Sequence, residues 1–300
     1  MHTVDCSYGL VATGTTSLKM VNQDACKVAV NPRVPLAGVI VADGVGSHYG
    51  AEVASEVVAV SLAAQLQALG PGERVDMRRL FAAAHFRLQN QIEEQLETLP
   101  PDLDWKNAFG TTAICVAETA GELTFGYVGN GGIFHIRGNF NTFPPSQLLP
   151  WNAVNHLNPH SIPVHGKNVM YKLLSPKSTP EESTPSVVTV SKDDTTFGDI
   201  VLCCTDGVYS YDQTPIGRDD QKSIWISGEK SMALFYESLA RFFEGEPSSG
   251  ALQATLDKYL HDLEAAGLVG DDCTVGVLIT QKALAFQAQM RARRAESVTA

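Results

Sequence analysis

The stretch VIVADGVGSHYGAEVAS, residues 39–55, decides how this chain is interpreted. An apolar run typical of a buried β-strand ends at Asp43, and glycines follow at positions 44, 46 and 50. An alanine-rich helical pattern begins at Ala51. A strand, a glycine-rich turn and a helix in this order can hold either a nucleotide phosphate or a metal ion.

The nucleotide alternative fails on spacing and on charge. A dinucleotide-binding turn has the pattern G-x-G-x-x-G, but Gly50 comes one residue too late for it. Asp43 would also place a negative charge beside the pyrophosphate. We therefore favour the metal alternative, because the Asp43 carboxylate and the Gly44 carbonyl are hard oxygen ligands of the kind that Mg²⁺ or Mn²⁺ prefers.

Three further aspartates lie at the ends of predicted buried strands. Asp206 ends the apolar run DIVLCCTD, Asp271 is followed by Asp272 and then by CTVGVLIT, and Asp24 stands just before ACKVAV. If these strands are neighbours in one core, their carboxylates converge on one acidic pocket. Carboxylates gathered in this way repel one another, so that a cation is their natural partner. Each aspartate taken alone is equally compatible with a plain turn or strand end.

Composition and charge narrow the class of protein. The chain has 300 residues, of which 44% are hydrophobic and 18% charged, as expected for a folded globular domain. The net charge of -11 argues against a nucleic-acid-binding protein. The six cysteines form no CxxC pair, and no signal peptide or membrane-spanning stretch is evident. We therefore expect a cytoplasmic protein with reduced, buried thiols and no membrane contact.

The hydrophobic periodicity predicts an α+β fold, because strands come in adjacent runs and helices in adjacent pairs. Residues 138–185 are rich in Pro, Asn, Ser and His, and are predicted to form a long irregular excursion with a short helix near 168–174. Residues 282–300 are predicted to be a basic C-terminal tail. Strands are expected at 7–16, 25–30, 36–43, 111–120, 122–129, 132–138, 186–191, 199–206 and 273–280, and helices at 51–69, 77–99, 229–244 and 248–266.

Six short motifs in a fixed order resemble those of one family. The chain is similar to the metal-dependent protein phosphatases, the PPM or type 2C serine/threonine phosphatases, in their bacterial form. The resemblance implies a four-layer α-β-β-α sandwich of two antiparallel sheets flanked by helix pairs. It places this domain at residues 1–281, with 138–185 as a flap-like excursion and 282–300 as a tail. The motifs are NQDA (22–25), VADGVG (41–46), FGTTAICV (109–116), GYVGNGG (126–132), LCCTDGV (202–208) and GDDCTVGVLI (270–279).

The resemblance also implies a chemistry. It implies that a metal-activated water hydrolyses phosphoserine and phosphothreonine monoesters in proteins. Such an enzyme acts in signal transduction and reverses the phosphorylation made by a cognate Ser/Thr kinase. Asp43 would bridge two Mn²⁺ or Mg²⁺ ions, and the Gly44 carbonyl would bind one of them. Asp206 and Asp271 would complete the ligand set. Asp24 would act on the metals through water, so that Asp43, Asp206 and Asp24 are the expected catalytic residues.

Two departures from the family pattern leave an alternative open. Lys19 stands where the family carries the arginine that grips the substrate phosphate, and lysine binds phosphate only as a point charge. Asn130 replaces an aspartate proposed to hold a third metal, and Ser210 replaces another, so that a third metal site is weakened. The alternative function is that of a pseudophosphatase, a module of the same fold that binds phosphoproteins for regulation.

Overall fold

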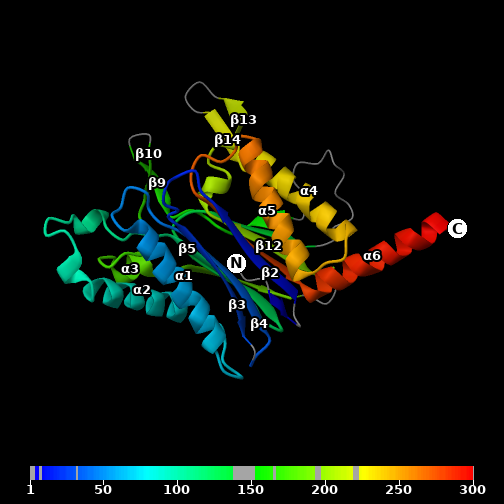
Figure 1. Cartoon of the computed structure of the whole chain (residues 1–300), viewed down its shortest axis with the longest axis horizontal. Helices are drawn as coiled ribbons and strands as arrows, with labels where there is room; N and C mark the ends of the chain where they lie inside the picture. Colours follow the sequence, from blue (N-terminus) through cyan, green and yellow to red (C-terminus); the bar gives the residue numbers. More distant parts are fainter. Residues whose placement is uncertain are drawn as a thin grey trace.

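The computed structural model describes residues 4–6, 9–31, 33–137, 153–164, 167–192, 197–218 and 223–299. Two antiparallel sheets lie face to face, with helices on both outer sides (Figure 1). The six-stranded sheet has the order β1 (Val4–Cys6), β2 (Gly9–Thr16), β15 (Cys273–Thr280), β12 (Asp199–Cys204), β7 (Gly132–Arg137) and β8 (Ala153–Asn155). The five-stranded sheet has the order β11 (Ser186–Ser191), β6 (Glu122–Val128), β5 (Ala113–Glu118), β4 (Leu36–Asp43) and β3 (Asp24–Asn31).

Helix pairs cover the two outer faces. Helices α1 (Ala51–Ala68) and α2 (Met77–Glu93) pack on the five-stranded sheet, and α4 (Glu229–Glu244) and α5 (Ser249–Ala265) pack on the six-stranded one. Side chains of Asp76 and Ser248 cap the first turns of α2 and α5 by accepting backbone N–H bonds. The four-layer α-β-β-α prediction is confirmed.

The apolar runs of the sequence are explained by burial on both sides of each sheet. β15 is buried along its whole length, and β4 is buried up to its last residue, Asp43. One face of such a central strand packs on the helices and the other on the opposite sheet, where Val39, Phe125, Ile133 and Val201 meet. A strand covered on both faces reads as a continuous hydrophobic run rather than an alternating one.

The predicted excursion is more regular than the sequence suggested. The helix expected near 168–174 is wrong, because Ile162 pairs with Val169 in a hairpin of β9 (Ser161–Val164) and β10 (Lys167–Met170). A short helix, α3 (Pro180–Ser183), follows, and β8 extends the six-stranded sheet. Residues 138–152 and 165–166 of the excursion lie outside the described part of the chain.

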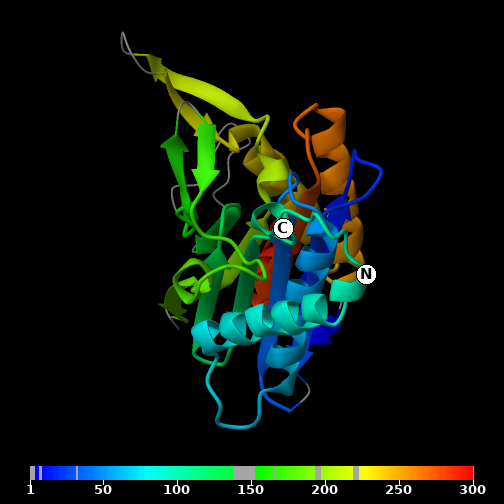
Figure 2. The same cartoon turned by 90° about the vertical axis from the view of Figure 1, so that its left-hand side faces the viewer.

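A second hairpin was not predicted at all. β13 (Gln213–Arg218) and β14 (Ser223–Ser227), which follow β12 and precede α4 in the sequence, pair antiparallel. Both hairpins project from the same end of the sandwich (Figure 2). That end therefore carries the two most prominent additions to the sandwich.

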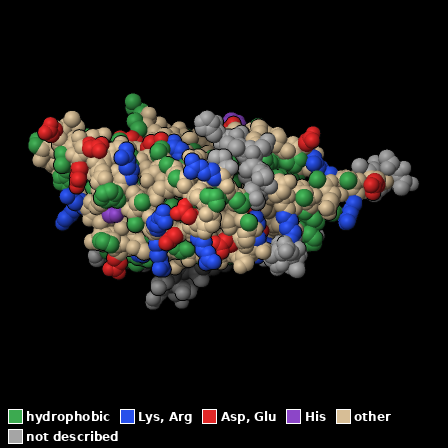
Figure 3. Space-filling view, turned by 90° about the horizontal axis from the view of Figure 1, so that it is seen from below, with side chains coloured by type: hydrophobic (Ala, Val, Ile, Leu, Met, Phe, Trp, Pro, Cys, Tyr) green, Lys and Arg blue, Asp and Glu red, His purple; other side chains and the backbone are tan. Residues whose placement is uncertain are grey.

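The C-terminal tail forms a helix, α6 (Gln281–Thr299), that continues directly from β15. Ala283 is fully buried against the core under α4 and α5, whereas the later turns project from the body of the molecule (Figures 1 and 3). Basic and acidic side chains are interspersed on the face seen in Figure 3. Among the described residues, no helix is both long and apolar enough to cross a bilayer.

A candidate metal centre at one end of the sandwich

The two aspartates of the five-stranded sheet are cross-strand partners. Asp24 begins β3 and Asp43 ends the antiparallel β4, and the register places them opposite each other. Directly opposite residues have Cβ atoms only about 5 Å apart. The pairing thus forces two carboxylates together at one end of the sheet, as the strand-end argument predicted.

The backbone of Asp43 is held by two threonines. The Asp43 carbonyl accepts hydrogen bonds from Thr112 N–H (2.8 Å) and from the Thr111 hydroxyl (3.0 Å). Asp43 N–H in turn donates to Thr112 Oγ1 at 3.2 Å. These three bonds hold the backbone at the end of β4, from which the Asp43 side chain extends. The FGTT motif was recognised in the sequence, but its task of clamping Asp43 was not.

Gly44 occupies a place that no larger residue could fill. A Cβ atom there would lie 2.6 Å from the Ala51 carbonyl oxygen and 2.7 Å from that of Gln23. Its N–H donates to the same Gln23 carbonyl at 3.0 Å. The glycine is therefore required for the close approach of the turn to β3 and to the start of α1.

Asp206 comes from the other sheet, one turn after β12, in a short 3₁₀ helix (Asp206–Val208). Its Oδ2 accepts a 2.7 Å hydrogen bond from the side-chain amide of Asn130. Asn130 lies in the Gly129–Gly131 turn between β6 and β7, and Tyr209 secures this turn by donating to the Gly131 carbonyl at 2.9 Å. The position expected to lack a metal ligand thus supplies a hydrogen-bond donor to a predicted metal ligand.

Asp24 is buried with one satisfied and one unsatisfied oxygen. Its Oδ2 accepts from Thr205 Oγ1 at 2.9 Å, while Oδ1 has no hydrogen-bond partner. The residue is 8% exposed. Its backbone N–H donates to Asn22 Oδ1 at 2.9 Å. A buried carboxylate oxygen without a partner is costly, and it marks the direction in which a ligand is missing.

Lys19, in the loop between β2 and β3, lies at the solvent-exposed edge of this group of aspartates, which we call the rim. Its ammonium forms an ion pair with Asp271, lies 3.7 Å from Asp272 and donates to Gln23 Oε1 at 3.1 Å. Lys19 and Asp271 have side chains that are 40% and 52% exposed. An exposed pair of this kind contributes little stability and exchanges readily.

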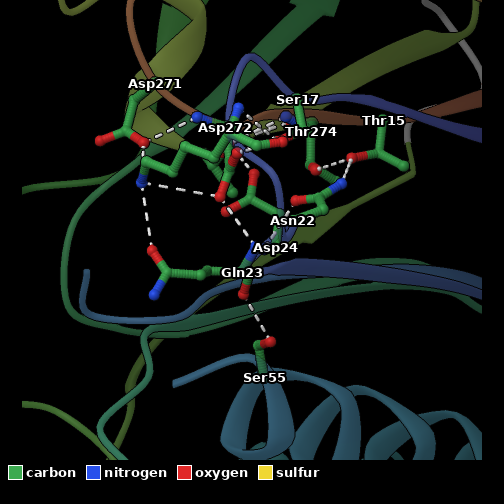
Figure 4. A network of polar contacts seen from close by, with 11 residues as sticks. Thr15, Ser17, Asn22, Gln23, Asp24, Ser55, Asp271, Asp272 and Thr274 are labelled. Carbon is green, nitrogen blue, oxygen red and sulfur yellow. Dashed lines mark hydrogen bonds and ion pairs between the residues drawn. The ribbon is translucent and has the colours of Figure 1, made fainter. Parts of the chain in front are cut away.

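Asp272 braces the loops rather than facing the cluster. It is 3% exposed, and accepts from the Ser17 hydroxyl through one oxygen and from Gln23 N–H at 2.8 Å through the other (Figure 4). The contacts join the start of β15 to the loop between β2 and β3. Asp272 therefore holds the turn before β15 against that loop.

The electrostatics of the cluster are those of crowded, desolvated acids. Burial, and then the charges of Asp24 and Asp206, raise the pKa of Asp43 well above its usual range. Burial raises the pKa of Asp24 to about 6, although the nearby hydroxyls of Thr274 and Thr205 oppose the shift. Without a cation, this is the behaviour of carboxyl groups that must retain a proton to coexist.

Asp206 follows the same rule. Burial, and then the charge of Asp271, raise its pKa, while the charge of Lys19 and the hydrogen bond from Asn130 oppose the rise. Asp43 is therefore acted on by a negative charge on each side, from Asp24 in its own sheet and from Asp206 after a strand of the other sheet.

The chemistry of these residues fits a hard divalent cation. The donors are carboxylate oxygens, one of them is buried and unpartnered, and positive charge would relieve their repulsion. A complete ligand cage is not preformed, since no three His, Cys, Asp or Glu side chains within the described residues are grouped to hold a metal ion. Asp271 forms an ion pair with Lys19 and still acts on Asp206 through its charge.

Comparison with known proteins gives the chain its family. A family model described as protein phosphatase 2C matches residues 13–261. A comparison with curated protein sequences gave no significant match. The family match covers every predicted site residue except Asp271.

Solved structures share the fold at low identity. A bacterial serine phosphatase matches with a TM-score of 0.60 and 16% identity, covering 90% of this chain and 97% of that one. The serine/threonine phosphatase Stp1 from Staphylococcus aureus matches with a TM-score of 0.59 and 16% identity, covering 90% and 94%. The catalytic domain of the serine/threonine protein phosphatase PstP, in complex with two manganese ions, matches with a TM-score of 0.58 and 16% identity, covering 91% and 98%. From its family match and its fold together, the chain belongs to the protein phosphatase 2C family.

Proposed function

We propose that the protein is a Mn²⁺- or Mg²⁺-dependent phosphatase of phosphoserine and phosphothreonine residues in proteins. The observation that carries the proposal is the cross-strand pairing of Asp24 with Asp43, with the charge of Asp206 acting on Asp43 from the other sheet and Asp24 Oδ1 buried without a partner. Membership of the protein phosphatase 2C family and the manganese in the PstP structure support it.

The metal ligands we propose are the carboxylates of Asp43, Asp206 and Asp271 and the carbonyl of Gly44, for two ions. Bound there, the cations would supply an activated water and would stabilise charge on the phosphoryl oxygens. Asp24, fixed by Thr205, would orient water from its free oxygen. The hydrogen bond from Asn130 would keep one lone pair of Asp206 occupied, which disfavours a third ion on that side.

Lys19 would bind the substrate phosphate. Its ammonium is the positive charge beside Asp271 and Asp272, and its ion pair with Asp271 is exposed. A cation that takes Asp271 would free Lys19 to face the phosphate. Phosphate binding and metal binding are thereby coupled through one carboxylate.

The surroundings we propose are those of a signalling enzyme in the cytoplasm. Five described cysteines, Cys26, Cys115, Cys203, Cys204 and Cys273, are free thiols, in keeping with a reducing compartment. The substrates would be proteins phosphorylated by a cognate Ser/Thr kinase. The acidic net charge of -11 disfavours nucleic acid as a partner.

The test is release of phosphate from a phosphothreonine peptide by the wild type, Asp43→Asn and Asp206→Asn. We expect turnover with Mn²⁺, none with EDTA, and a loss of roughly a hundredfold or more in each variant because both carboxylates would hold the metals. Asn31→Ala, which removes bonds to the Leu66 and Leu69 carbonyls at the other end of β3, is the control for lost stability. Turnover in EDTA equal to that in Mn²⁺ would contradict the proposal.

One observation favours the pseudophosphatase alternative. Asn130 and Lys19 both occupy carboxylates that the metals would need, through the bonds to Asp206 and Asp271. If these contacts persist, the same end of the sandwich would bind phosphoproteins without hydrolysing them. Binding of the phosphothreonine peptide by folded protein, with no phosphate released at saturating Mn²⁺, would decide for this alternative.

A further inference from the structure

His160 is a buried histidine that the proposed chemistry does not use. It is 4% exposed and stands immediately before β9, at the base of the β9–β10 hairpin. Tyr171, the residue after β10, closes that base by donating its N–H to the His160 carbonyl at 2.9 Å, and its ring lies 5.7 Å from the imidazole. The hairpin therefore leaves the body of the protein through His160 and Tyr171.

The same histidine grips the turn that carries Asn130. Gly129 N–H donates to His160 Nδ1 at 3.1 Å, and His160 N–H donates back to the Gly129 carbonyl at 2.9 Å. Gly129 has a φ of +96°, so its backbone conformation is one that few other residues adopt. Backbone and side chain of His160 together fix the residue directly before Asn130.

The imidazole is itself locked in one tautomer and one plane. Because Gly129 N–H is a donor, Nδ1 must accept, and the ring proton sits on Nε2, which lies 2.8 Å from Ser186 Oγ. Tyr127 stacks on the ring at 5.1 Å with an interplanar angle of 21°. Burial and the charge of Lys172 lower the pKa of His160 to about 4, in keeping with a neutral ring.

We propose that His160 is a positioning residue that aims the Asn130 amide at Asp206 and ties the β9–β10 hairpin to that contact. The chain of contacts runs from Tyr171 through His160 and Gly129 to Asn130, and ends in the 2.7 Å bond to Asp206. Its effect on catalysis rests on the proposed phosphatase function. Its effect on the turn does not.

Two variants of His160 distinguish the hydrogen bond at Nδ1 from the one at Nε2. In His160→Asn, Oδ1 takes the place of Nδ1 and can still accept from Gly129. In His160→Gln, the amide reaches Ser186 but leaves Gly129 N–H without an acceptor. Amide hydrogen exchange of Gly129 and Asn130, measured by NMR relative to Val39 in the middle of β4, reports the turn without any substrate or metal.

We expect His160→Gln to speed exchange at Gly129 relative to Val39 by roughly tenfold, and His160→Asn to stay near the wild type. The stability control Asn31→Ala should leave this ratio unchanged. Mn²⁺ affinity and kcat should fall in His160→Gln with little change in KM, because Asp206 and not the phosphate contact is disturbed. Equal exchange ratios in the Gln and Asn variants would overturn the proposal.

The tie to the hairpin has its own test. Tyr171→Ala keeps the backbone bond to His160 but removes the ring that packs on the imidazole. It should speed exchange at Gly129 in the same direction, and combining it with His160→Gln should add little, since both disturb the seating of one side chain. Full additivity would overturn the hairpin part. If His160→Gln does not fold, Ser186→Ala replaces it, as it keeps the ring and removes only its Nε2 partner. No change at Gly129 in Ser186→Ala would then count against the proposal.

The outcomes distinguish this inference from the proposed function. A wild type that releases no phosphate, combined with faster exchange at Gly129 in His160→Gln, contradicts the phosphatase and supports the positioning role. A wild type that turns over, combined with variants that match it in exchange and in kcat, supports the phosphatase and overturns the positioning role.

Discussion

The Asn130 amide donates to Asp206 in a place where an aspartate would set two negative charges side by side. The exchange of one oxygen for a nitrogen thus turns a repulsion into a hydrogen bond when no cation is bound. Asn-Gly also suits a tight hairpin turn. Compared with an aspartate at this position, Asn130 stabilises the metal-free protein but offers no carboxylate to a metal ion.

Asn130→Asp should make stability depend more steeply on metal. In EDTA, we expect the variant to lose about 1–3 kcal/mol in the free energy of unfolding, because the new carboxylate faces Asp206 without a hydrogen bond. Saturating Mn²⁺ should recover most of this loss, and kcat at high Mn²⁺ should rise. Thermal unfolding in EDTA and in Mn²⁺ measures it, with Asn130→Ala as the uncharged control. A variant as stable as the wild type in EDTA would contradict the account.

The raised pKa of Asp24 predicts how metal-free stability depends on pH. The value is 3.8 in the unfolded chain and about 6 in the fold, so the folded state binds the proton more tightly. Stability is then greatest below pH 4 as far as this group is concerned. It falls by roughly 3 kcal/mol as pH rises from about 4 to above 6.

Urea unfolding in EDTA between pH 4 and pH 7 measures this slope. Asp24→Asn, which carries no titrating group, should flatten it, and Mn²⁺ should offset the loss at the upper end. An unchanged slope in Asp24→Asn would mean that other groups dominate the titration.

Part of the site could be predicted residue by residue. Asp24 and Asp43 were expected to meet because a buried strand ends at one and begins after the other, and the register confirms it. The contact of Lys19 with Asp271 could not be foreseen, because it depends on how two irregular loops fold over the rim. Nor could the role of His160, since its partner Gly129 lies 31 positions away.

At the scale of elements, buried strands and amphipathic helices were predictable and the hairpins were not. The runs at 36–43 and 273–280 are long, apolar and covered on both faces, and they were found at their observed positions. β9 and β10 have four residues each, and Ile162 and Val169 are about half exposed. Short strands outside the core leave little hydrophobic signal in the sequence.

The C-terminal helix α6 should matter for stability only in its first turns. Phe286 lies 4.4 Å from Phe197, ring centre to ring centre, and packs with Leu284 against the core under α4 and α5. We expect Phe286→Ala to cost about 1–3 kcal/mol of unfolding free energy. Deleting residues 292–300 should cost less than about 0.5 kcal/mol, because Ala292 and Arg293 are exposed. Urea unfolding measures both losses of stability. Equal losses in Phe286→Ala and in the truncated chain would contradict the claim that only the first turns of α6 matter.

At the scale of the whole molecule, the sandwich explains why distant aspartates meet. β3 and β4 in one sheet and β12 and β15 in the other all begin or end at the same place, so residues up to 247 positions apart in sequence share one rim (Asp24 to Asp271). Both hairpins project together from one end of the sandwich (Figure 2). The architecture concentrates carboxylates there, and their raised pKa values record the cost of doing so without a cation.

The central claim is that this rim binds divalent cations through Asp43. Isothermal titration of the metal-free protein with Mn²⁺ tests it most directly, with Asp43→Asn as the variant and Asn31→Ala as the control. We predict two equivalents bound by the wild type and by Asn31→Ala, with release of protons from the carboxyl cluster, and loss of this binding in Asp43→Asn. Binding of Mn²⁺ by folded Asp43→Asn as tightly as by the wild type would contradict the account.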